Sequence, residues 1–433
     1  MGIKALYHLC CQIWKQQEWP EDWKLQEFVM LYKNGNSKEC GNYRTIALIS
    51  HASKILLIII LNRMKCKVEE ELSDCQAGYR ANRGTTDMLF VLQIIIEKIR
   101  DGNEEGYITF IDYSKAFDSV IHSKLLDVMT EMGFPQHLIS MIASLYHNRK
   151  ATIRWNNANC EPFNIEKGVR QGCILSPHLF NLYTEQIMIQ AYINDMGINI
   201  GGRDITNLRY ADDTALLADN LTSMKRILHR VNNAGQQAGL LLNAKKTKVM
   251  HIPASKESSN VEPDIKIDRT SLENVDNFKY LGSIKASDGT CTKDVNTRIA
   301  MAKQGMVSLN NIWKDKSIPK PLKFKLLKTL VWPRMLYGCG TWTIRKADES
   351  KIEAAKMWFF RRLLRVSWKD RRTNGYVLAE MGTGRTLLSL VKERRLKYIG
   401  HAERNTKTDL MKTIFEGKTE AKKRKRQAII ILC

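Results

Sequence analysis

The sequence has no C-x-x-C pair, no long hydrophobic run and comparatively few acidic residues. Its ten cysteines are scattered from Cys10 to Cys433, without the spacing of a zinc knuckle or zinc ribbon, so we expect no zinc. Such scatter favours free thiols in a reducing compartment. The longest strongly apolar run, Ile55 to Leu61, is far shorter than the ~20 residues of a membrane-spanning helix. We therefore expect no membrane attachment.

The deficit of acidic residues leaves the chain strongly basic. Its 433 residues include 68 Lys and Arg against 45 Asp and Glu, a net charge of +23. Such an excess favours a polyanionic partner, because binding to phosphates releases counterions. The alternative, a basic protein without a nucleic-acid partner, stays open on charge alone. A chain of this length suggests two or three packed subdomains.

Hydrophobic periodicity divides the chain into a mixed first part and a helical second part. The pattern predicts helices over 1–22, 50–72, 85–100, near 123, and over 179–192 and 223–239. It predicts strands over 28–32, 107–111, 151–155, 208–218 and 240–252. Beyond residue 290 an apolar stripe predicts a helix bundle, with members Val295, Ile299, Ala302, Met306, Leu309 and Trp313. Strands interleaved with long helices predict an α+β fold.

Carboxylates occur at two positions where strands are expected to end. Tyr210-Ala211-Asp212-Asp213 lies at the bend of a predicted hairpin, and Asp112 directly follows the strand 107–111. Adjacent carboxylates repel each other, and a divalent cation removes that cost. Two magnesium ions need carboxylates from separate segments to bridge them. The alternatives are a solvated Asp-Asp turn and, for Asp112, a helix N-cap.

A glycine-rich loop lies between these carboxylates in the sequence. It reads Gly168-Val169-Arg170-Gln171-Gly172, and glycines there let the backbone approach a ligand closely. The order strand-Asp, Arg-Gln-Gly loop, Asp-Asp hairpin resembles motifs A, B and C of LINE-type (non-LTR) retrotransposon reverse transcriptases. The three segments share the family's Ala-Phe-Asp, Gly-Val-Arg-Gln-Gly and Tyr-Ala-Asp-Asp wording.

The resemblance spans about residues 15–405. Leu31-Tyr32-Lys33, the segment Asn42 to Ile46, and Gln76-Ala77-Gly78-Tyr79-Arg80 resemble the family's fingers motifs. The segment Leu242 to Lys248 resembles motif D, and Phe278 to Gly282 resembles the primer grip. Lys397-Tyr398-Ile399-Gly400-His401 resembles a segment after the thumb in RTE/BovB-like elements.

The resemblance implies a right-hand polymerase fold. Fingers and palm would occupy residues 1–286, with core motifs over 28–286, a helical thumb 287–345, and a basic helical C-terminal region 346–433. The implied activity is RNA-directed DNA polymerisation, extending a primer 3′-hydroxyl with dNTPs on an RNA template. The implied partners are the RNA template, a DNA primer or RNA–DNA hybrid, and dNTPs. Two Mg²⁺ ions, or Mn²⁺ in their place, would be the cofactors.

Site roles follow residue by residue from the matching motifs. Those matched to catalysis and metal are Asp112, Asp212, Asp213, Lys246 and the backbone carbonyl of Ile111. Those matched to the incoming nucleotide are Lys33, Arg44, Phe117, Arg170, Gln171 and Gly172. Candidates for contact with nucleic acid are Arg80, Tyr280, Leu281, Gly282, Lys323, Lys325, Lys328, Arg361 and Arg362.

Several of these roles have plain alternatives. Phe117 matches the steric gate that excludes a 2′-hydroxyl, but a core phenylalanine is an equal possibility. Lys246 would protonate the departing pyrophosphate, with Lys245 and Lys248 as rivals. The stretch containing Arg361 and Arg362 would stack and clamp RNA, or form a buried helix with arginines reaching solvent.

The sequence also departs from the family. We expect a truncated element without the usual endonuclease, because the matching motifs begin close to Met1. The basic run 422–426 replaces the family's Gly-Arg-Pro-rich segment; it could aid nuclear import, and we expect a nuclear or cytoplasmic location. The competing functions are a non-catalytic nucleic-acid-binding remnant and a group II intron maturase. The maturase is disfavoured by the tail and by the lack of a His-Asn-His nuclease motif.

Overall fold

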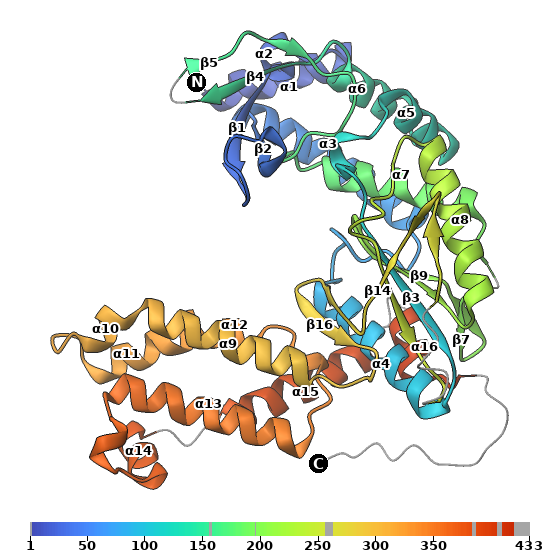
Figure 1. Ribbon diagram of the computed structural model, residues 1–433. Helices are drawn as coiled ribbons and strands as arrows, with labels where there is room; N and C mark the ends of the chain where they lie inside the picture. Colours follow the sequence, from blue (N-terminus) through green and yellow to red (C-terminus); the bar gives the residue numbers. More distant parts are fainter. Residues whose placement is uncertain are drawn as a thin grey trace.

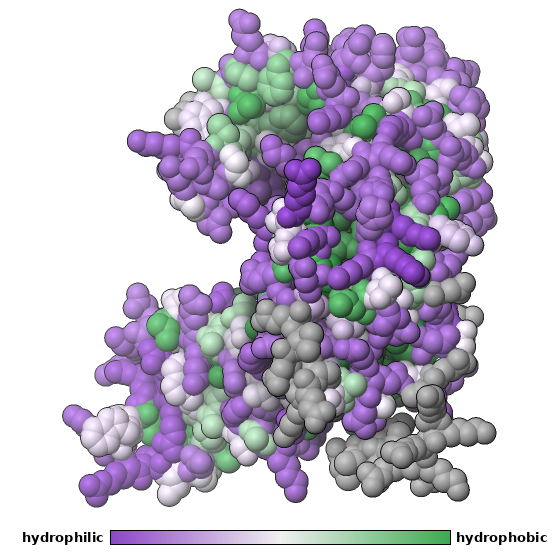
Figure 2. All heavy atoms as spheres, turned by 45° about the vertical axis from the view of Figure 1, so that its right-hand side comes forward, coloured by the Kyte–Doolittle hydropathy of each residue, from purple (hydrophilic) through white to green (hydrophobic). Residues whose placement is uncertain are grey.

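The computed structural model describes residues 2–155, 158–194, 196–255, 263–382, 387–404 and 409–419. The chain has an open, C-shaped outline, with the N-terminal elements at the top and the central strands on the right (Figure 1). The C-terminal helices extend to the lower left. Figure 2 shows a deep recess between the upper part and these helices. Within the described ranges, no helix has both the length and the apolar character needed to cross a membrane.

The first half of the chain alternates helices with strands. Its elements are α1 (Gly2–Gln16), α2 (Glu21–Lys24), β1 (Gln26–Tyr32), β2 (Tyr43–Leu48), α3 (His51–Glu71), α4 (Thr85–Gly102), β3 (Gly106–Ile111), α5 (His122–Glu131), α6 (Gln136–Tyr146), β4 (Lys150–Trp155), β5 (Ala158–Asn159), β6 (Phe163–Asn164) and α7 (Ser176–Ala191).

The second half begins with short strands and then becomes helical. Its elements are β7 (Ile198–Ile200), β8 (Arg203–Ile205), β9 (Asn207–Tyr210), β10 (Asp213–Ala218), α8 (Leu221–Gln237), β11 (Lys248–Ile252), β12 (Lys266–Ile267), β13 (Thr270–Ser271), β14 (Glu273–Asn274), β15 (Asn277–Tyr280), β16 (Ser283–Ala286), α9 (Thr292–Ser308), α10 (Asn310–Lys314), α11 (Lys320–Leu326), α12 (Trp332–Leu336), α13 (Lys346–Leu364), α14 (Asn374–Met381), α15 (Leu387–Arg404) and α16 (Asp409–Glu416).

Two five-stranded sheets organise the mixed part. One has the order β2-β1-β4-β5, with β6 also pairing with β4. The other has the order β14-β11-β3-β10-β9, and its central strand β3 is antiparallel to both β10 and β11. All six residues of β3 are buried, as expected for a strand covered on both faces.

The side chains of β3 alternate between two hydrophobic cores. Tyr107 and Ile111 join a core formed largely with α3, α5, α6, α7 and α8. Ile108 and Phe110 join a second core, which contains residues of α4 and α16. This alternation is the period-two pattern of a strand. A third core lies entirely among residues 291–391 and holds the C-terminal helices together.

The predicted helical stripe after residue 290 is confirmed. Val295, Ile299, Ala302 and Met306 are buried on α9, and Trp313 is buried on α10. This third core takes residues from both sides of position 345, so the thumb and C-terminal region pack together. The division of the chain into three domains stays a prediction.

Two predicted element boundaries were wrong. The helix predicted over 1–22 ends at Gln16, because Gln17 adopts a left-handed backbone (φ 60°), and α2 starts only after Pro20. The strand predicted over 240–252 is confined to Lys248–Ile252. The residues before it form a turn, in which the Thr247 amide donates to the Asn243 carbonyl at 2.9 Å.

Candidate active site

Strand pairing brings the three predicted aspartates to one edge of the central sheet. Thr214 pairs with Ile111 across β10 and β3. Because the strands are antiparallel, Asp213 therefore lies beside Asp112, the residue after β3. Tyr210 pairs with Asp213 in the β9–β10 hairpin, which leaves Ala211 and Asp212 as its two-residue turn. Ala211 takes a left-handed φ of 58°, a conformation such hairpin turns require.

The three carboxylates repel one another. Burial, followed by the charges of Asp212 and Asp112, raises the pKa of Asp213 to about 6. Burial and the Asp112 charge also raise the pKa of Asp212. Both side chains stay accessible to solvent, so water is only partly displaced around them. Holding several negative charges close together costs free energy. A bound cation would offset that cost and stabilise the ionised carboxylates.

The donor set fits magnesium. Asp112 Oδ2 is buried without a hydrogen-bond partner, and its nearest cation is the Lys246 ammonium, 3.7 Å away. Within the described residues, no group of three or more His, Cys, Asp or Glu side chains is arranged so that it could hold a metal ion by itself. Magnesium tolerates this arrangement, because it keeps several waters and takes substrate phosphate oxygens as ligands. The Ile111 side chain has no atom that can bind a metal, so its backbone carbonyl is the candidate ligand.

The segment that resembles motif D encloses Asp112. The Asn243 amide donates to the Asp112 carbonyl at 2.7 Å, and the Asp112 amide lies 3.3 Å from Thr247 Oγ1. These bonds fix the backbone on either side of the carboxylate. Lys246, in the same turn, is exposed and reaches the site, whereas Lys248 pairs with Glu273 at 2.5 Å. Of the two alternative lysines, Lys245 and Lys248, the second is therefore engaged in an ion pair with Glu273.

The hairpin turn with Asp212 is supported from behind by residues 75–78. Gln76 Oε1 accepts hydrogen bonds from the amides of Gly78 and Ala211, at 2.8 and 3.0 Å. A side chain on Gly78 would put its Cβ 2.4 Å from the Ala211 nitrogen, so glycine is required by this close approach.

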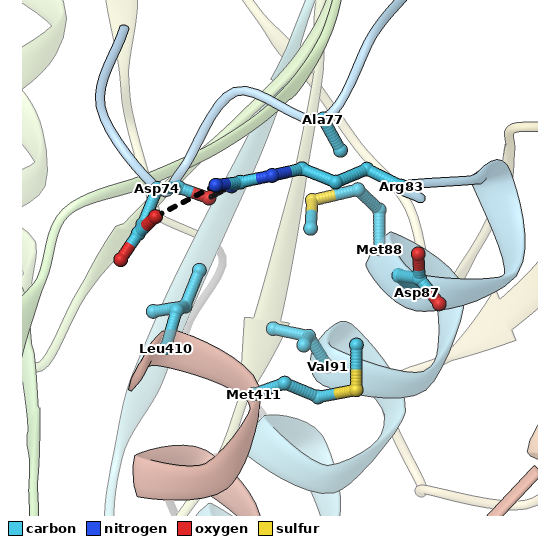
Figure 3. Close-up of a pocket in the computed structure, with 8 residues that line it drawn as sticks. All are labelled: Asp74, Ala77, Arg83, Asp87, Met88, Val91, Leu410 and Met411. Atoms are coloured by element: carbon cyan, nitrogen blue, oxygen red, sulfur yellow. Dashed lines mark hydrogen bonds and ion pairs between the residues drawn. The ribbon is translucent and has the colours of Figure 1, made fainter. Parts of the chain in front are cut away.

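A buried ion pair holds the strand before the turn. The Arg209 guanidinium donates to both carboxylate oxygens of Glu185 at 2.9 and 3.0 Å, and both side chains are almost wholly buried. The pair links β9 to α7. The supporting segment is itself fixed, because Arg83 pairs with Asp74 at 2.9 Å beside a small cavity where α16 meets α4 (Figure 3).

Sequence reasoning missed the residues that carry this support. Gln76, Arg209 and Glu185 received no role. Gln76 lay within a fingers-type motif, and Arg209 directly precedes the Tyr-Ala-Asp-Asp tetrapeptide. The available signal was that Gln76 and Arg209 lie close to motif residues. The buried ion pair joins Arg209 on strand β9 to Glu185 on helix α7, and such a contact between distant elements is not visible as a pattern in the sequence.

Two basic residues predicted to hold the triphosphate are exposed on the β1–β2 hairpin. Arg44 pairs with Leu31 across the strands, and its charge lowers the pKa of Asp212 against the larger effect of burial. Arg44 is therefore close enough to act on the carboxylate site. The Lys33 amide donates to the Asn42 carbonyl at 2.9 Å, and its side chain is exposed. Both positions are compatible with the predicted role.

The glycine-rich loop connects this hairpin to the palm side. The Ala47 amide of β2 donates to the Gln171 carbonyl at 3.0 Å, and the Gln171 side-chain amide donates to Asp118 at 3.0 Å. Gly172 has a φ of 105°, and a Cβ added there would lie 3.1 Å from the Ala47 carbonyl oxygen. The loop thus holds Gln171 next to the residue that follows Phe117.

Phe117 has a core contact as well as a position near the site. Its ring is half-buried and stacks on Phe180, with centroids 4.5 Å apart. Its carbonyl accepts a hydrogen bond from the Val169 amide at 2.8 Å. The structure therefore accommodates both sequence interpretations, because one face packs on Phe180 while part of the side chain remains accessible.

Three predicted ligand-binding cations, Arg170, Arg80 and Lys323, are buried and bonded within the protein, and their contact with a ligand stays a prediction. Arg170 donates to the carbonyls of Trp23 and Lys24 at 3.1 and 3.2 Å. Arg80 pairs with Glu69 at 2.9 Å and donates to two backbone carbonyls. Lys323 donates to the Trp313 carbonyl at 3.0 Å. Each cation already bonds carbonyl or carboxylate oxygens of the protein, so binding a nucleotide or nucleic acid would require some of those bonds to break.

The predicted primer grip is a short hairpin, β15–β16. Tyr280 is buried, its hydroxyl 3.3 Å from the Leu208 carbonyl, and the Leu281 side chain is also buried. These two side chains therefore pack inside the protein, and the contact of this hairpin with nucleic acid stays a prediction. Gly282 is exposed at the turn, and Tyr337 of the helical region donates to the Leu281 carbonyl at 2.8 Å.

The remaining basic candidates lie among the C-terminal helices. Lys325 and Lys328 are exposed, which leaves them available for a phosphate backbone. Arg361 and Arg362 are half-buried; Arg361 donates to Asn374 at 2.9 Å, and Arg362 lies 5.4 Å from the Trp358 ring. Neighbouring Phe359 and Phe360 are fully buried, so this stretch is foremost a packed helix.

Comparison with known proteins identifies the family of this chain. A model of the family described as reverse transcriptase (RNA-dependent DNA polymerase) matches residues 32–284, more than half of the chain. This chain belongs to the reverse transcriptase family. The matched range contains the three aspartates, the glycine-rich loop and the whole sheet built around β3, and of the other sheet it contains every strand except β1. The expected α+β polymerase fold with fingers and palm is thereby confirmed.

Its relatives come from mobile elements. The Pol polyprotein of the type-1 retrotransposable element R2 from Popillia japonica is 27% identical over 76% of this reverse transcriptase and 47% of the relative. The probable RNA-directed DNA polymerase from transposon BS of Drosophila melanogaster is 27% identical over 82% and 40%. The expected non-LTR relationship is confirmed, and assignment to the RTE/BovB clade stays a prediction. The chain spans less than half the length of these relatives.

Solved structures resemble the reverse transcriptase only distantly. The apo telomerase from Candida tropicalis has a TM-score of 0.46 and 10% identity, over 96% of this chain and 74% of the telomerase. A picobirnavirus RNA-dependent RNA polymerase has a TM-score of 0.41 and 12% identity, over 86% and 65%.

Proposed function

We propose that this reverse transcriptase is an RNA-directed DNA polymerase that extends a primer 3′-hydroxyl with dNTPs on an RNA template. The observation that carries the proposal is the meeting of Asp112, Asp212 and Asp213 at one sheet edge, with Arg44 close enough to lower the pKa of Asp212. Such an arrangement combines carboxylates that can bind metal ions with a nearby guanidinium that can bind phosphate.

The reaction joins the primer 3′-oxygen to the α-phosphorus of the nucleotide. The bond from that phosphorus to the bridging oxygen breaks, pyrophosphate leaves, and the 3′-hydroxyl loses its proton. Lys246 would give the departing pyrophosphate a proton, and its ammonium, 3.7 Å from the Asp112 carboxylate, supports that role. Arg44 and Lys33 would hold the triphosphate in line, and Gln171 would border the base and sugar.

The cofactor would be a pair of Mg²⁺ ions, with Mn²⁺ as a substitute, held by the three aspartates and by the Ile111 carbonyl. When bound, the ions supply charge neutralisation and activate the attacking oxygen. The chain contributes the fixed carboxylate positions: the Asn243–Asp112 bond on one side and the Gln76–Ala211 bond on the other.

The first prediction is the loss of primer extension in Asp112→Ala and Asp212→Ala. Each variant should retain less than about 1% of the extension rate, because two-metal catalysis depends on these carboxylates. The assay uses an oligo(dT) primer on poly(rA) with Mg²⁺, and chelation by EDTA should stop it. Asp127→Ala, which removes an exposed aspartate from α5, is the matched control and should extend at the wild-type rate.

The second candidate is a non-catalytic nucleic-acid-binding remnant. The three carboxylates and Lys246, which lies 3.7 Å from Asp112, oppose it. A folded wild-type chain that binds the primer–template but adds no nucleotide would establish the remnant. Location in the nucleus or cytoplasm is a further proposal; the run 422–426 lies outside the described residues, and imaging of a tagged chain with and without that run tests it.

A further inference from the structure

An exposed aromatic and basic surface lies at the far end of the helical region. We call it the tip surface; it consists of Trp368, Lys369, Arg371, Arg372 and Tyr376. Trp368 is 84% exposed and Tyr376 41% exposed. Other tryptophans of the region, Trp313, Trp332 and Trp342, are buried in its core. α14, which begins beside this surface, lies at the lower left of Figure 1, away from the central sheet.

Local hydrogen bonds hold the tip surface in a defined shape. The Ser367 amide donates to Asp370 at 2.6 Å, and Thr373 caps α14 by accepting from the Tyr376 amide at 3.2 Å. Arg361 of α13 donates to the Arg372 carbonyl at 3.0 Å. Val377, directly after Tyr376, is buried in the helical core. The exposed aromatic side chains therefore project from a segment whose backbone is held by hydrogen bonds.

The segment that carries these rings is strongly basic. Between positions 361 and 376 the acidic residue is Asp370, and it accepts the Ser367 amide. The basic residues in the same interval are Arg361, Arg362, Arg365, Lys369, Arg371 and Arg372. The Arg372 guanidinium lies 4.6 Å from the Tyr376 ring centroid, and the Lys369 ammonium lies 6.0 Å from that of Trp368. Each ring thus has a cation beside it.

We propose that the tip surface binds single-stranded RNA, separately from the polymerase site. Exposed aromatic rings offer a stacking face to an unpaired base, and the adjacent arginines and lysine offer contacts to its phosphates. A duplex would leave no free base face for Trp368, so an unpaired strand fits better than a hybrid. The choice of RNA rests on the proposed function, since an RNA-templated polymerase has an unpaired template strand to hold.

Photocross-linking on the full chain tests the site directly. RNA of about 20 nucleotides containing 5-iodouracil reacts preferentially with aromatic side chains stacked on the base. Peptide mapping should place cross-links on Trp368 or Tyr376. Fluorescence anisotropy with the same RNA should show an affinity loss of about tenfold or more for Trp368→Ala, because stacking on one base contributes that much. Trp368→Phe should restore most of the affinity.

Two double variants that each remove two positive charges distinguish binding at the tip surface from general electrostatic attraction of RNA to a basic protein. Arg371→Ala with Arg372→Ala should weaken RNA binding strongly, whereas Lys225→Ala with Arg226→Ala, on exposed positions of α8, should weaken it little. Equal losses for both pairs, or cross-links elsewhere only, would overturn the proposal. So would tighter Trp368-dependent binding to phosphatidylserine vesicles than to RNA. A chain without primer extension that still cross-links through Trp368 would refute the proposed function and support this site.

Discussion

At the scale of single residues, Phe117 is both a packing residue and the candidate selector of deoxynucleotides. Phe117→Val should lower the ratio of catalytic efficiencies for dNTP and rNTP by about 10- to 100-fold, or ~1.4–2.8 kcal/mol, because the smaller side chain admits a 2′-hydroxyl. It should also cost about 1–2 kcal/mol of stability, because the stack on Phe180 is lost. Steady-state kinetics with both nucleotide types and thermal unfolding measure the two effects.

Phe180→Leu is the matched control for that experiment. It removes the same stack from the fully buried partner, so it should reduce stability and leave the dNTP-to-rNTP ratio unchanged. If both variants alter the ratio equally, Phe117 acts through packing. If Phe117→Val is folded and active with an unchanged ratio, it is a core residue without a gating role.

Two arginines given the same role by the sequence should behave differently. Arg44→Gln should raise the KM for dNTP by about 10-fold or more, because a charge-assisted contact to phosphate is lost, with little change in Tm. Arg170→Gln should instead reduce the free energy of unfolding by about 1–3 kcal/mol, because the part-buried Trp23 and Lys24 carbonyls lose their donor. Steady-state kinetics and thermal unfolding of both variants measure these effects. A higher KM for Arg170→Gln together with a lower Tm for Arg44→Gln would contradict these two roles.

At the scale of elements, the β9–β10 hairpin depends on the segment behind it. Gly78→Ala should reduce single-turnover extension by about 100-fold, because its Cβ would lie 2.4 Å from the Ala211 nitrogen and displace Asp212. Gly84→Ala is the matched control: its Cβ meets no atom closer than 3.9 Å, and its backbone is extended. Wild-type extension by Gly78→Ala would show that the hairpin tolerates movement here.

The β15–β16 hairpin shows how elements distant in sequence meet. Its turn is held from the helical region by Tyr337, and the buried Asp294 of α9 accepts hydrogen bonds from Ser283 and the Ile284 amide at 2.7 and 3.0 Å. Arg298 of the same helix lies 4.5 Å from the Tyr337 ring. These contacts join the hairpin firmly to the helices, so the two should move together.

At the scale of the whole molecule, the net charge of +23 should make binding of an RNA–DNA hybrid strongly salt-dependent. Lys325→Ala should reduce the slope of log affinity against log salt by about one, if this exposed lysine contacts a phosphate. Lys323→Ala should leave the slope unchanged and lower Tm, because its ammonium serves the Trp313 carbonyl. The measurement is anisotropy from low to high salt, and a flat wild-type line would exclude a phosphate-tracking groove.

The sequence by itself determined the chemistry at the strand ends. Asp112 follows an apolar run that is local in the sequence, and Asp212 and Asp213 belong to the four consecutive residues, Tyr210 to Asp213, that define the hairpin turn. The helical stripe from Val295 was equally readable, because helix periodicity needs only neighbours along the chain.

Only the tertiary structure decided which cations are free to meet a ligand. Arg44 and Arg170 are alike as residue types, yet one is exposed and the other is buried against carbonyls of a distant segment. Likewise the hydrogen bond between Ala211 and Gln76 and the ion pair between Arg209 and Glu185 join residues separated by 135 and 24 positions. Burial and hydrogen-bond partners depend on packing between such segments, and a local sequence pattern carries no record of that packing.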